Sequence, residues 1–171
     1  ELEQLSMAES GAAAGSLAAA DESPNPFYTV YRSFMEPGGI HDEMLELAAE
    51  NRDIVKYERI GTSTLGKPMA VLKVTQNARN VADNTRPAVL YSSNNHAREW
   101  IAAEVERRLM RWIIEHKNDP KIADLLARTE LWFMPVANPD GYDFTFEPGQ
   151  RLWRKNLRDN DGDGTLTDAD G

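Results

Sequence analysis

The stretch Pro87-Ala-Val-Leu-Tyr-Ser-Ser-Asn-Asn-His-Ala-Arg-Glu-Trp100 joins a short apolar run to the start of a strongly periodic segment. The apolar run predicts a buried strand, and the periodic segment predicts a helix that begins near Glu99. His96 and Glu99 are three residues apart, so their side chains share one face at the start of that helix. Imidazole nitrogen and carboxylate oxygen both bind Zn²⁺, and a catalytic zinc site uses three protein ligands plus a position for water. The stretch therefore offers two candidate ligands.

The spacing of His96 and Glu99 leaves a second interpretation open. A surface histidine followed by a glutamate in the first helical turn fits equally well, because a carboxylate there complements the helix dipole. The other two histidines lie in different contexts. His41 opens a predicted helix and is expected to be a solvated surface residue. His116 ends the long predicted helix, where an imidazole interacts favourably with the dipole.

Charge and composition exclude several kinds of protein. The 171 residues carry 19 basic and 28 acidic side chains, a formal net charge of −9. Residues 1–31 and 159–171 hold five acids each and no lysine or arginine, which leaves a nearly neutral body without the concentrated basic surface of a nucleic-acid-binding protein. Because the chain has no cysteine, it has no disulfide, thiolate zinc site or cysteine nucleophile. No apolar run approaches the roughly 18 residues of a membrane span.

Hydrophobic periodicity predicts a mixture of helices and strands. Helices are expected at His41–Asn51, Glu99–His116 and Lys121–Arg128, and strands at Val55–Ile60, Met69–Thr75, Ala88–Ser92 and Leu131–Val136. The first two strands form a hairpin, and the last is apolar throughout, as is typical of a strand buried on both faces. The face of the long helix that we expect to meet the core consists of Ile101, Val105, Leu109 and Trp112.

This order of elements predicts an α/β fold with a mixed central sheet and helices on both faces, incomplete in this chain. Residues 1–26, rich in Ala, Gly, Ser and acids, are expected to be a low-complexity linker or the remnant of a pro-region. Residues 27–158 are expected to fold, and residues 159–171 form a separate Asp/Gly-rich segment. Sites in such sheets lie beyond the C-terminal ends of strands, which is where His96 and Asn138 stand.

Three further motifs accompany His96-Ala-Arg-Glu-Trp100. The residues from Gly61 to Pro68 follow the pattern Gly-x-Ser/Thr-x-x-Gly-Lys/Arg-Pro. Asn138-Pro-Asp-Gly-Tyr142 has the composition of a turn, with proline after asparagine and a closing glycine. Arg151-Leu-Trp-Arg-Lys-Asn156 has the composition of a basic surface loop anchored by Trp153.

Together and in this order, the four motifs resemble the zinc carboxypeptidases, metallopeptidases that remove C-terminal amino acids. The resemblance runs from about Tyr28 to Asn156. It implies that residues 27–158 are the N-terminal part of the catalytic domain, that the cofactor is Zn²⁺, and that the substrates are the C-termini of peptides and proteins. It also implies a secreted or extracellular protein, since such enzymes usually digest extracellular peptides.

The resemblance also assigns roles to individual residues. It makes His96 and Glu99 zinc ligands, and Arg98 matches an arginine that contacts the backbone carbonyl of the bound peptide. Arg154 matches the arginine that polarises the scissile carbonyl and stabilises the oxyanion, a task suited to a permanently charged planar guanidinium. Arg151 matches a more peripheral subsite residue. The third zinc ligand, the general-base glutamate and the groups that hold the substrate's terminal carboxylate are implied to lie later than Gly171. We therefore expect the 171 residues alone to bind zinc weakly and to lack peptidase activity.

The C-terminal residues follow the template of a calcium-binding loop, with oxygens at positions 1, 3, 5, 9 and 12, glycine at 6 and a backbone carbonyl at 7. The candidate Ca²⁺ ligands are Asp159, Asp161, Asp163, Thr165 and Asp170. Asp170 replaces the usual glutamate, and no helix clearly flanks the loop, so a solvated acidic insertion is the alternative.

Two alternatives to an enzyme stay open. A non-catalytic member of the same fold would bind peptide termini or calcium as an interaction module. An unrelated α/β protein that carries the motifs by chance would have His96 and Glu99 pointing apart.

Overall fold

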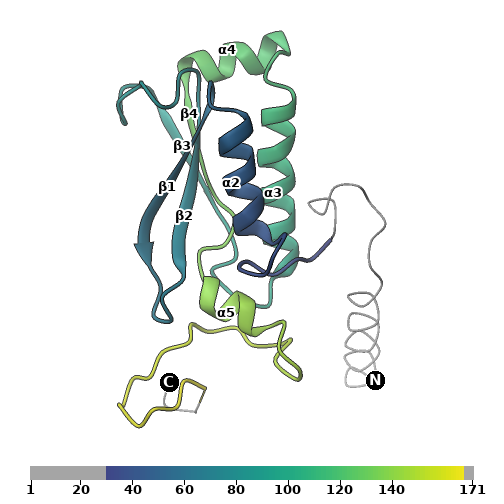
Figure 1. Cartoon of the computed structure of the whole chain (residues 1–171), viewed down its shortest axis with the longest axis vertical. Helices are drawn as coiled ribbons and strands as arrows, with labels where there is room; N and C mark the ends of the chain where they lie inside the picture. Colours follow the sequence, from purple (N-terminus) through teal and green to yellow (C-terminus); the bar gives the residue numbers. More distant parts are fainter. Residues whose placement is uncertain (1–29, 168–171) are drawn as a thin grey trace. The chain divides into compact units, whose positions relative to one another are not determined.

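The computed structural model describes residues 30–167 (Figure 1). The linker expected at residues 1–26 lies outside them. The elements, in chain order, are α2 (Ile40–Glu50), β1 (Val55–Thr62), β2 (Pro68–Val74), β3 (Ala88–Ser92), α3 (Trp100–Glu115), α4 (Pro120–Arg128), β4 (Glu130–Met134) and α5 (Pro139–Phe144). The helices and strands predicted from periodicity lie within two residues of these bounds, and only α5 was not predicted as a helix.

The four strands form one mixed sheet in the order β1-β2-β4-β3. β1 and β2 form the predicted antiparallel hairpin, β4 is antiparallel to β2, and β3 is parallel to β4. Helices α2 and α3 lie against the sheet and against each other (Figure 1). The prediction of an α/β fold with a mixed sheet is therefore confirmed.

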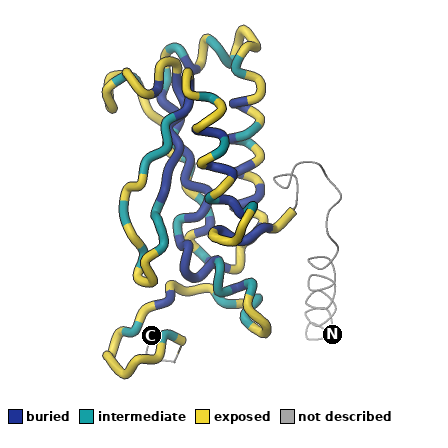
Figure 2. The backbone as a smooth tube through the Cα atoms, viewed as in Figure 1, coloured by how far each residue is buried: buried dark blue, intermediate teal, exposed yellow. Residues whose placement is uncertain are grey.

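The core lies between the sheet and the two long helices. On the sheet, the pairs Leu72 with Phe133 and Val74 with Leu131 are buried side by side across β2 and β4. Figure 2 shows this buried layer as dark blue along the central strands and along parts of both helices. β4 is buried along most of its length, as its continuous apolar sequence predicted.

β3 does not match the prediction of a buried strand. It pairs only with β4 among the described residues, and its Val89 and Leu90 side chains are 43% and 63% exposed. Apolar sequence indicates a tendency to be buried, but burial also requires a neighbour on each edge and each face. The edge position of β3 removes one of these neighbours, so the run of apolar residues alone gave the wrong burial.

The predicted core face of α3 was wrong at three of its four residues, whereas the fourth, Leu109, packs against the core as expected. Ile101 and Val105 are each 59% exposed and Trp112 is 48% exposed. The buried face consists of Trp100, Ala103, Glu104, Glu106, Arg107, Met110, Ile113 and Ile114. Periodicity favoured the other face because it treats charged side chains as solvent-facing, whereas Glu104 and Arg107 are buried as partners of each other.

A buried group of charges joins α2 to α3. The Glu43 carboxylate, with no exposed surface, accepts hydrogen bonds from Arg107 at 3.2 Å and Arg111 at 2.7 Å, and it also pairs with Arg32. Arg107 pairs in turn with Glu104 at 2.7 Å. Removing one partner from such a group leaves an uncompensated buried charge, which costs about 3–5 kcal/mol. These charges therefore fix how the two helices pack.

Glu106 is a second kind of buried acid on α3, one without a cationic partner in the described residues. Its side chain is 6% exposed, and its Oε1 atom has no hydrogen-bond partner there. Burial raises the pKa of this carboxyl above its usual value, and contacts with the Ser93 side chain and the Met134 backbone offset part of that rise. The folded protein therefore holds the Glu106 proton more tightly than the unfolded chain does.

We expect Glu106→Gln to become increasingly stabilising as the pH rises. With a raised pKa in the folded state, the contribution of wild-type Glu106 is present below the unfolded pKa of about 4.3 and is lost as pH rises through the folded pKa. The difference in melting temperature between variant and wild type, measured by thermal unfolding from pH 4 to pH 8, should grow with pH. Glu50→Gln, an exposed substitution on α2, is the control. A difference independent of pH would contradict this account.

Candidate metal centre

His96 and Glu99 lie in contact on the loop between β3 and α3. The Nδ1 atom of His96 is 2.9 Å from Oε1 of Glu99, and the two side chains are 41% and 48% exposed. Two ligands of a tetrahedral zinc ion, each about 2.0–2.1 Å from the metal, stand about 3.3 Å apart. The two donor atoms are therefore close enough to share one ion, and the side chains do not point apart.

Asn94 shapes this loop. It adopts a left-handed backbone conformation with φ of 53°, which asparagine tolerates better than most residues. Its buried side-chain amide lies 3.3 Å from the carbonyl oxygens of His96, Ala97 and Glu99, to which it donates. The backbone thus curls around one amide, and the His96 and Glu99 side chains face outward together. We did not identify Asn94 from the sequence, where only its position after a strand and its asparagine neighbour mark it.

Arg154 reaches the same point from a distant segment. Its Nη2 atom is 3.2 Å from Nδ1 of His96, although 58 residues separate the two, and its carbonyl oxygen accepts a hydrogen bond from the Ala97 amide at 3.1 Å. Nδ1 cannot both donate to Glu99 and accept from Arg154 in one tautomer. With the ring proton on Nε2, the Nδ1 lone pair lies beside the Glu99 carboxylate oxygen, and it can bind a metal ion once the Arg154 guanidinium donates elsewhere. This donor set fits Zn²⁺.

The two other arginines singled out from the sequence occupy different positions. The Arg98 side chain is exposed and makes no hydrogen bond or ion pair with residues 30–167. The Arg151 guanidinium lies 3.8 Å from the centre of the Trp100 ring and donates to the Arg98 carbonyl at 3.0 Å. Trp100 is fixed by two further contacts. Its ring stacks on Phe146, with 4.2 Å between ring centres, and its indole N–H donates a hydrogen bond to the Thr145 hydroxyl. Arg151 therefore supports the loop that carries Arg98.

The other histidines contact groups of the fold. His116 follows the last residue of α3, where its Nδ1 atom is 2.8 Å from the Trp112 carbonyl oxygen, in agreement with its predicted place at the helix end. His41 was expected to be solvated, but it is half-buried. Its Nε2 atom is 2.9 Å from the Tyr57 hydroxyl, and burial lowers its pKa.

The motif that begins at Asn138 forms the short helix α5, where the sequence had suggested a turn. Asparagine, proline and a glycine suit both structures, because Asn138 caps the helix and proline is favoured at its first position. The helix is favoured over the turn by two of its aspartates, which bond residues that lie far away in the sequence. Asp140 accepts hydrogen bonds from the Ser63 hydroxyl at 2.8 Å and the Leu65 amide at 3.0 Å. Asp143 pairs with Lys67 at 2.7 Å.

Helix α5 also contacts the segment that carries Arg154. The Asn138 side-chain amide donates to the Lys155 carbonyl at 3.1 Å. The same carbonyl oxygen passes so close to Gly141 that a Cβ atom on that residue would lie only 2.6 Å from it. Residue 141 is thus restricted to glycine by close approach of backbone to backbone.

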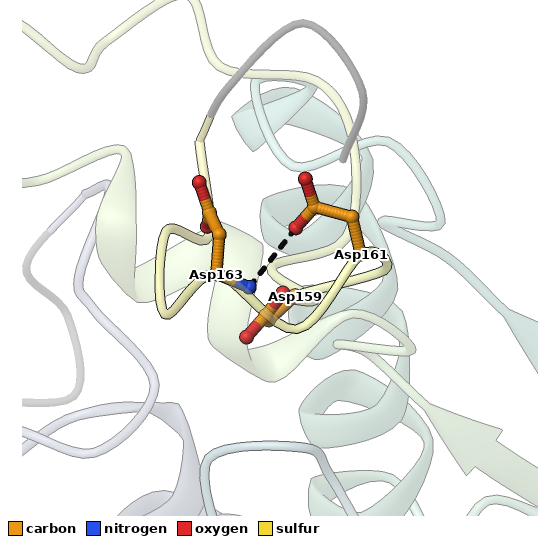
Figure 3. Close-up of side chains that lie close together, drawn as sticks. All are labelled: Asp159, Asp161 and Asp163. Atoms are coloured by element: carbon orange, nitrogen blue, oxygen red, sulfur yellow. Dashed lines mark hydrogen bonds between the residues drawn. The ribbon is translucent and has the colours of Figure 1, made fainter.

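One side-chain oxygen from each of Asp159, Asp161 and Asp163 lies within 4.8 Å of the other two (Figure 3). Asp159 accepts from the backbone amides of Gly162 at 2.7 Å and Gly164 at 2.9 Å, which lowers its pKa. Thr165 is exposed on the same loop, and Asp170 lies outside the described residues. The structure brings three of the candidate calcium ligands together, an arrangement that exposed acids also adopt without an ion.

Among residues 30–167, none of the helices could serve as a membrane span.

Comparison with known proteins agrees with the resemblance. A family model described as zinc carboxypeptidase matches residues 40–170. Carboxypeptidase A4 of Mus musculus is 34% identical over 133 residues, which cover 77% of this chain and 30% of that protein. Zinc carboxypeptidase of Saccharothrix mutabilis subsp. capreolus is 30% identical over 135 residues, with 78% and 30% covered. The crystal structure of carboxypeptidase A from Helicoverpa armigera matches with a TM-score of 0.68 and 30% identity, over 92% of this chain and 36% of that one. The chain thus spans about a third of the length of these relatives.

We expect Gly141→Ala to separate α5 from the Arg154 segment. The added methyl group meets a backbone oxygen that cannot rotate away, so the free energy of unfolding should fall by about 1–3 kcal/mol. The Ala97 amide, which bonds the Arg154 carbonyl, should then exchange its hydrogen faster, as hydrogen-exchange mass spectrometry or NMR would measure. Gly61→Ala is the control, since its Cβ would meet only the Met69 side chain at 3.7 Å. Equal effects of the two substitutions would show that the contact is unimportant.

Proposed function

Because the chain belongs to the zinc carboxypeptidase family, we propose that the protein hydrolyses the C-terminal bond of peptides and proteins and that this chain carries part of the active site. The observation that supports the proposal best is the convergence of His96, Glu99 and Arg154. Nδ1 of His96 lies 2.9 Å from Oε1 of Glu99 and 3.2 Å from Nη2 of Arg154.

In this proposal, His96 and Glu99 would hold Zn²⁺ through an imidazole nitrogen and a carboxylate oxygen. The chemistry that a bound zinc ion would supply is a lower pKa, toward about 7, for a water molecule bound to it. Arg154 stabilises the negative charge that develops on the scissile carbonyl oxygen, a role suited to a planar, positively charged guanidinium.

The exposed Arg98 side chain binds the backbone carbonyl of the peptide. Arg151 contributes to substrate binding by fixing the Arg98 carbonyl, a role compatible with its contact with Trp100. The third zinc ligand and the general base come from outside these 171 residues, as the resemblance implies, and the protein acts on extracellular peptides. We therefore expect the 171 residues alone to bind zinc weakly and to release no amino acid.

Substitution of the proposed residues tests the metal and the reaction together. Zinc titration by calorimetry should show a strong loss of affinity in His96→Ala and Glu99→Ala, and none in the control His116→Ala, whose ring bonds the end of α3. Mass spectrometry of model peptides should show loss of the C-terminal residue by the intact protein, abolished by a chelator. In Arg154→Ala, kcat should fall by about 10²–10³-fold with zinc still bound.

If the 171 residues alone remove C-terminal amino acids from a peptide, the third zinc ligand and the general base cannot both lie outside them, and that part of the proposal would be wrong. Binding of zinc and peptide by the intact protein without any cleavage would instead support the non-catalytic module.

We further propose that the loop from Asp159 to Asp170 binds Ca²⁺. The proximity of Asp159, Asp161 and Asp163 supports this, and the template adds the Thr165 carbonyl and Asp170. The carboxylates of Asp159, Asp161 and Asp163 accept hydrogen bonds from backbone amides of the same loop, and these bonds hold the loop in a curled conformation.

Calorimetric titration with Ca²⁺ should give one site with a dissociation constant in the range of about 10⁻⁵–10⁻³ M, since the loop lacks the bidentate glutamate. Asp161→Asn should weaken binding at least about tenfold, because one of the few charged ligands is lost. Asp124→Asn, an exposed substitution on α4, should leave binding unchanged. The absence of heat at millimolar Ca²⁺ would identify the segment as a solvated acidic insertion.

A further inference from the structure

The candidate metal centre is assembled from two segments that are 58 residues apart, and one side chain bridges them. We propose that Asn138 is a positioning residue, whose side-chain amide sets the distance between the segment of His96 and that of Arg154. The inference rests on the proposed function, since it concerns the same site. Asn138 does not contact the metal or the substrate in this scheme.

The side chain of Asn138 is 6% exposed and makes three contacts. Its Nδ2 atom donates to the Lys155 carbonyl at 3.1 Å and, more weakly, to the Asn95 carbonyl at 3.5 Å. Its Oδ1 atom accepts from the Gly141 amide at 3.0 Å. Lys155 follows Arg154 in the chain, and Asn95 precedes His96. One carboxamide thus bonds the neighbour of each of the two functional residues.

A backbone bond completes the bridge. The Ala97 amide donates to the Arg154 carbonyl at 3.1 Å, so residues on both sides of His96 are bonded to residues 154 and 155, directly or through Asn138. The Arg154 guanidinium then comes within 3.2 Å of the imidazole. Few side chains can replace this bridge, because it needs two donors and one acceptor at the length of asparagine.

Helix α5, which carries Asn138 at its N-cap, is itself held by two other segments of the chain. The Gly61–Pro68 loop bonds Asp140 through Ser63 and Leu65, and it bonds Asp143 through Lys67. The Phe34 amide donates to Asp143 at 2.6 Å, and the Tyr142 hydroxyl donates to the Arg32 carbonyl at 2.8 Å. The Gly61–Pro68 motif lies earlier in the sequence than the candidate metal ligands. Its role in this scheme is to fix helix α5, at whose N-cap Asn138 lies.

Asn138 is also the N-cap of α5, and a merely structural role as a cap must be separated from positioning. Asn138→Asp separates them, because aspartate keeps the acceptor for Gly141 and caps a helix as well as asparagine does. It loses both donors and turns an oxygen toward two carbonyl oxygens. The matched control is Asp119→Asn, at the N-cap of α4, where the side chain only accepts from Lys121 and Ile122.

The test uses the intact protein loaded with zinc. In Asn138→Asp we expect zinc affinity, measured by competition with a chromophoric chelator, to fall about 10–100-fold, the usual effect of changing a residue that orients metal ligands. For a peptide substrate, kcat should fall about tenfold or more while KM changes less than about threefold, since the loss affects a transition-state contact. Asp119→Asn should change neither quantity.

A double-mutant cycle supplies the readout that a structural defect would not give. If Asn138 acts by placing Arg154, adding Asn138→Asp to Arg154→Ala should lower kcat less than about threefold further. A full additional loss in the double variant, or unchanged zinc affinity and kcat in Asn138→Asp, would overturn the inference. If Asn138→Asp does not fold, Asn138→Ser runs the same cycle, because serine keeps a capping acceptor, adds no charge and also lacks the amide donors.

The zinc measurement distinguishes this inference from the proposed function. Suppose that the wild-type protein cleaves no peptide but that Asn138→Asp lowers the affinity for zinc. This result would refute the proposed function and support the positioning role of Asn138. If the wild-type protein cleaves peptides and Asn138→Asp changes neither zinc affinity nor kcat, the proposed function would be supported and the positioning role of Asn138 refuted.

Discussion

Helix α5 cannot form on its own, and the candidate site depends on it. It has six residues, too few to recover the cost of starting a helix in water. Its polar side chains are satisfied by groups from elsewhere: Asp140 and Asp143 by the Gly61–Pro68 loop, and Tyr142 by the Arg32 carbonyl. The helix is therefore stable only when the Gly61–Pro68 loop and the segment of Arg32 are packed against it, and its position depends on where they lie. Asn138, the N-cap of α5, connects this helix to the residues next to His96 and Arg154.

Most of the secondary structure could be predicted from the sequence, because hydrophobic periodicity is a local signal. The errors concern properties that local sequence does not contain. The wrong face of α3 was chosen because Arg107 is buried together with two carboxylates, that of Glu104 on the same helix and that of Glu43, which lies 64 residues earlier. A turn was expected at α5 because asparagine, proline and glycine suit both conformations. The distant partners of Asp140 and Asp143 decide the matter.

The same distinction applies to the site. The spacing of His96 and Glu99 made them candidates, but the expected first turn of a helix is in fact a turn that precedes α3, closed by the hydrogen bond from the Glu99 amide to the His96 carbonyl. Arg154 entered only through the resemblance to the family, since no local pattern links it to His96. Asn94 and Asn138 were not assigned any role, because an asparagine after a strand has many uses. Their bonds to carbonyl oxygens become visible only when the loops are placed in space.

The magnitudes explain why this site needs a scaffold of backbone bonds. The contacts among His96, Glu99 and Arg154 are about half exposed, and exposed ionic contacts contribute only about 0–1 kcal/mol. That is too little to hold three side chains at a fixed spacing against their rotamer entropy. The buried bonds of Asn94 and Asn138 are different, because breaking one leaves an unsatisfied polar group that costs about 1–3 kcal/mol. The geometry of these three exposed side chains is therefore set by the buried amides of Asn94 and Asn138.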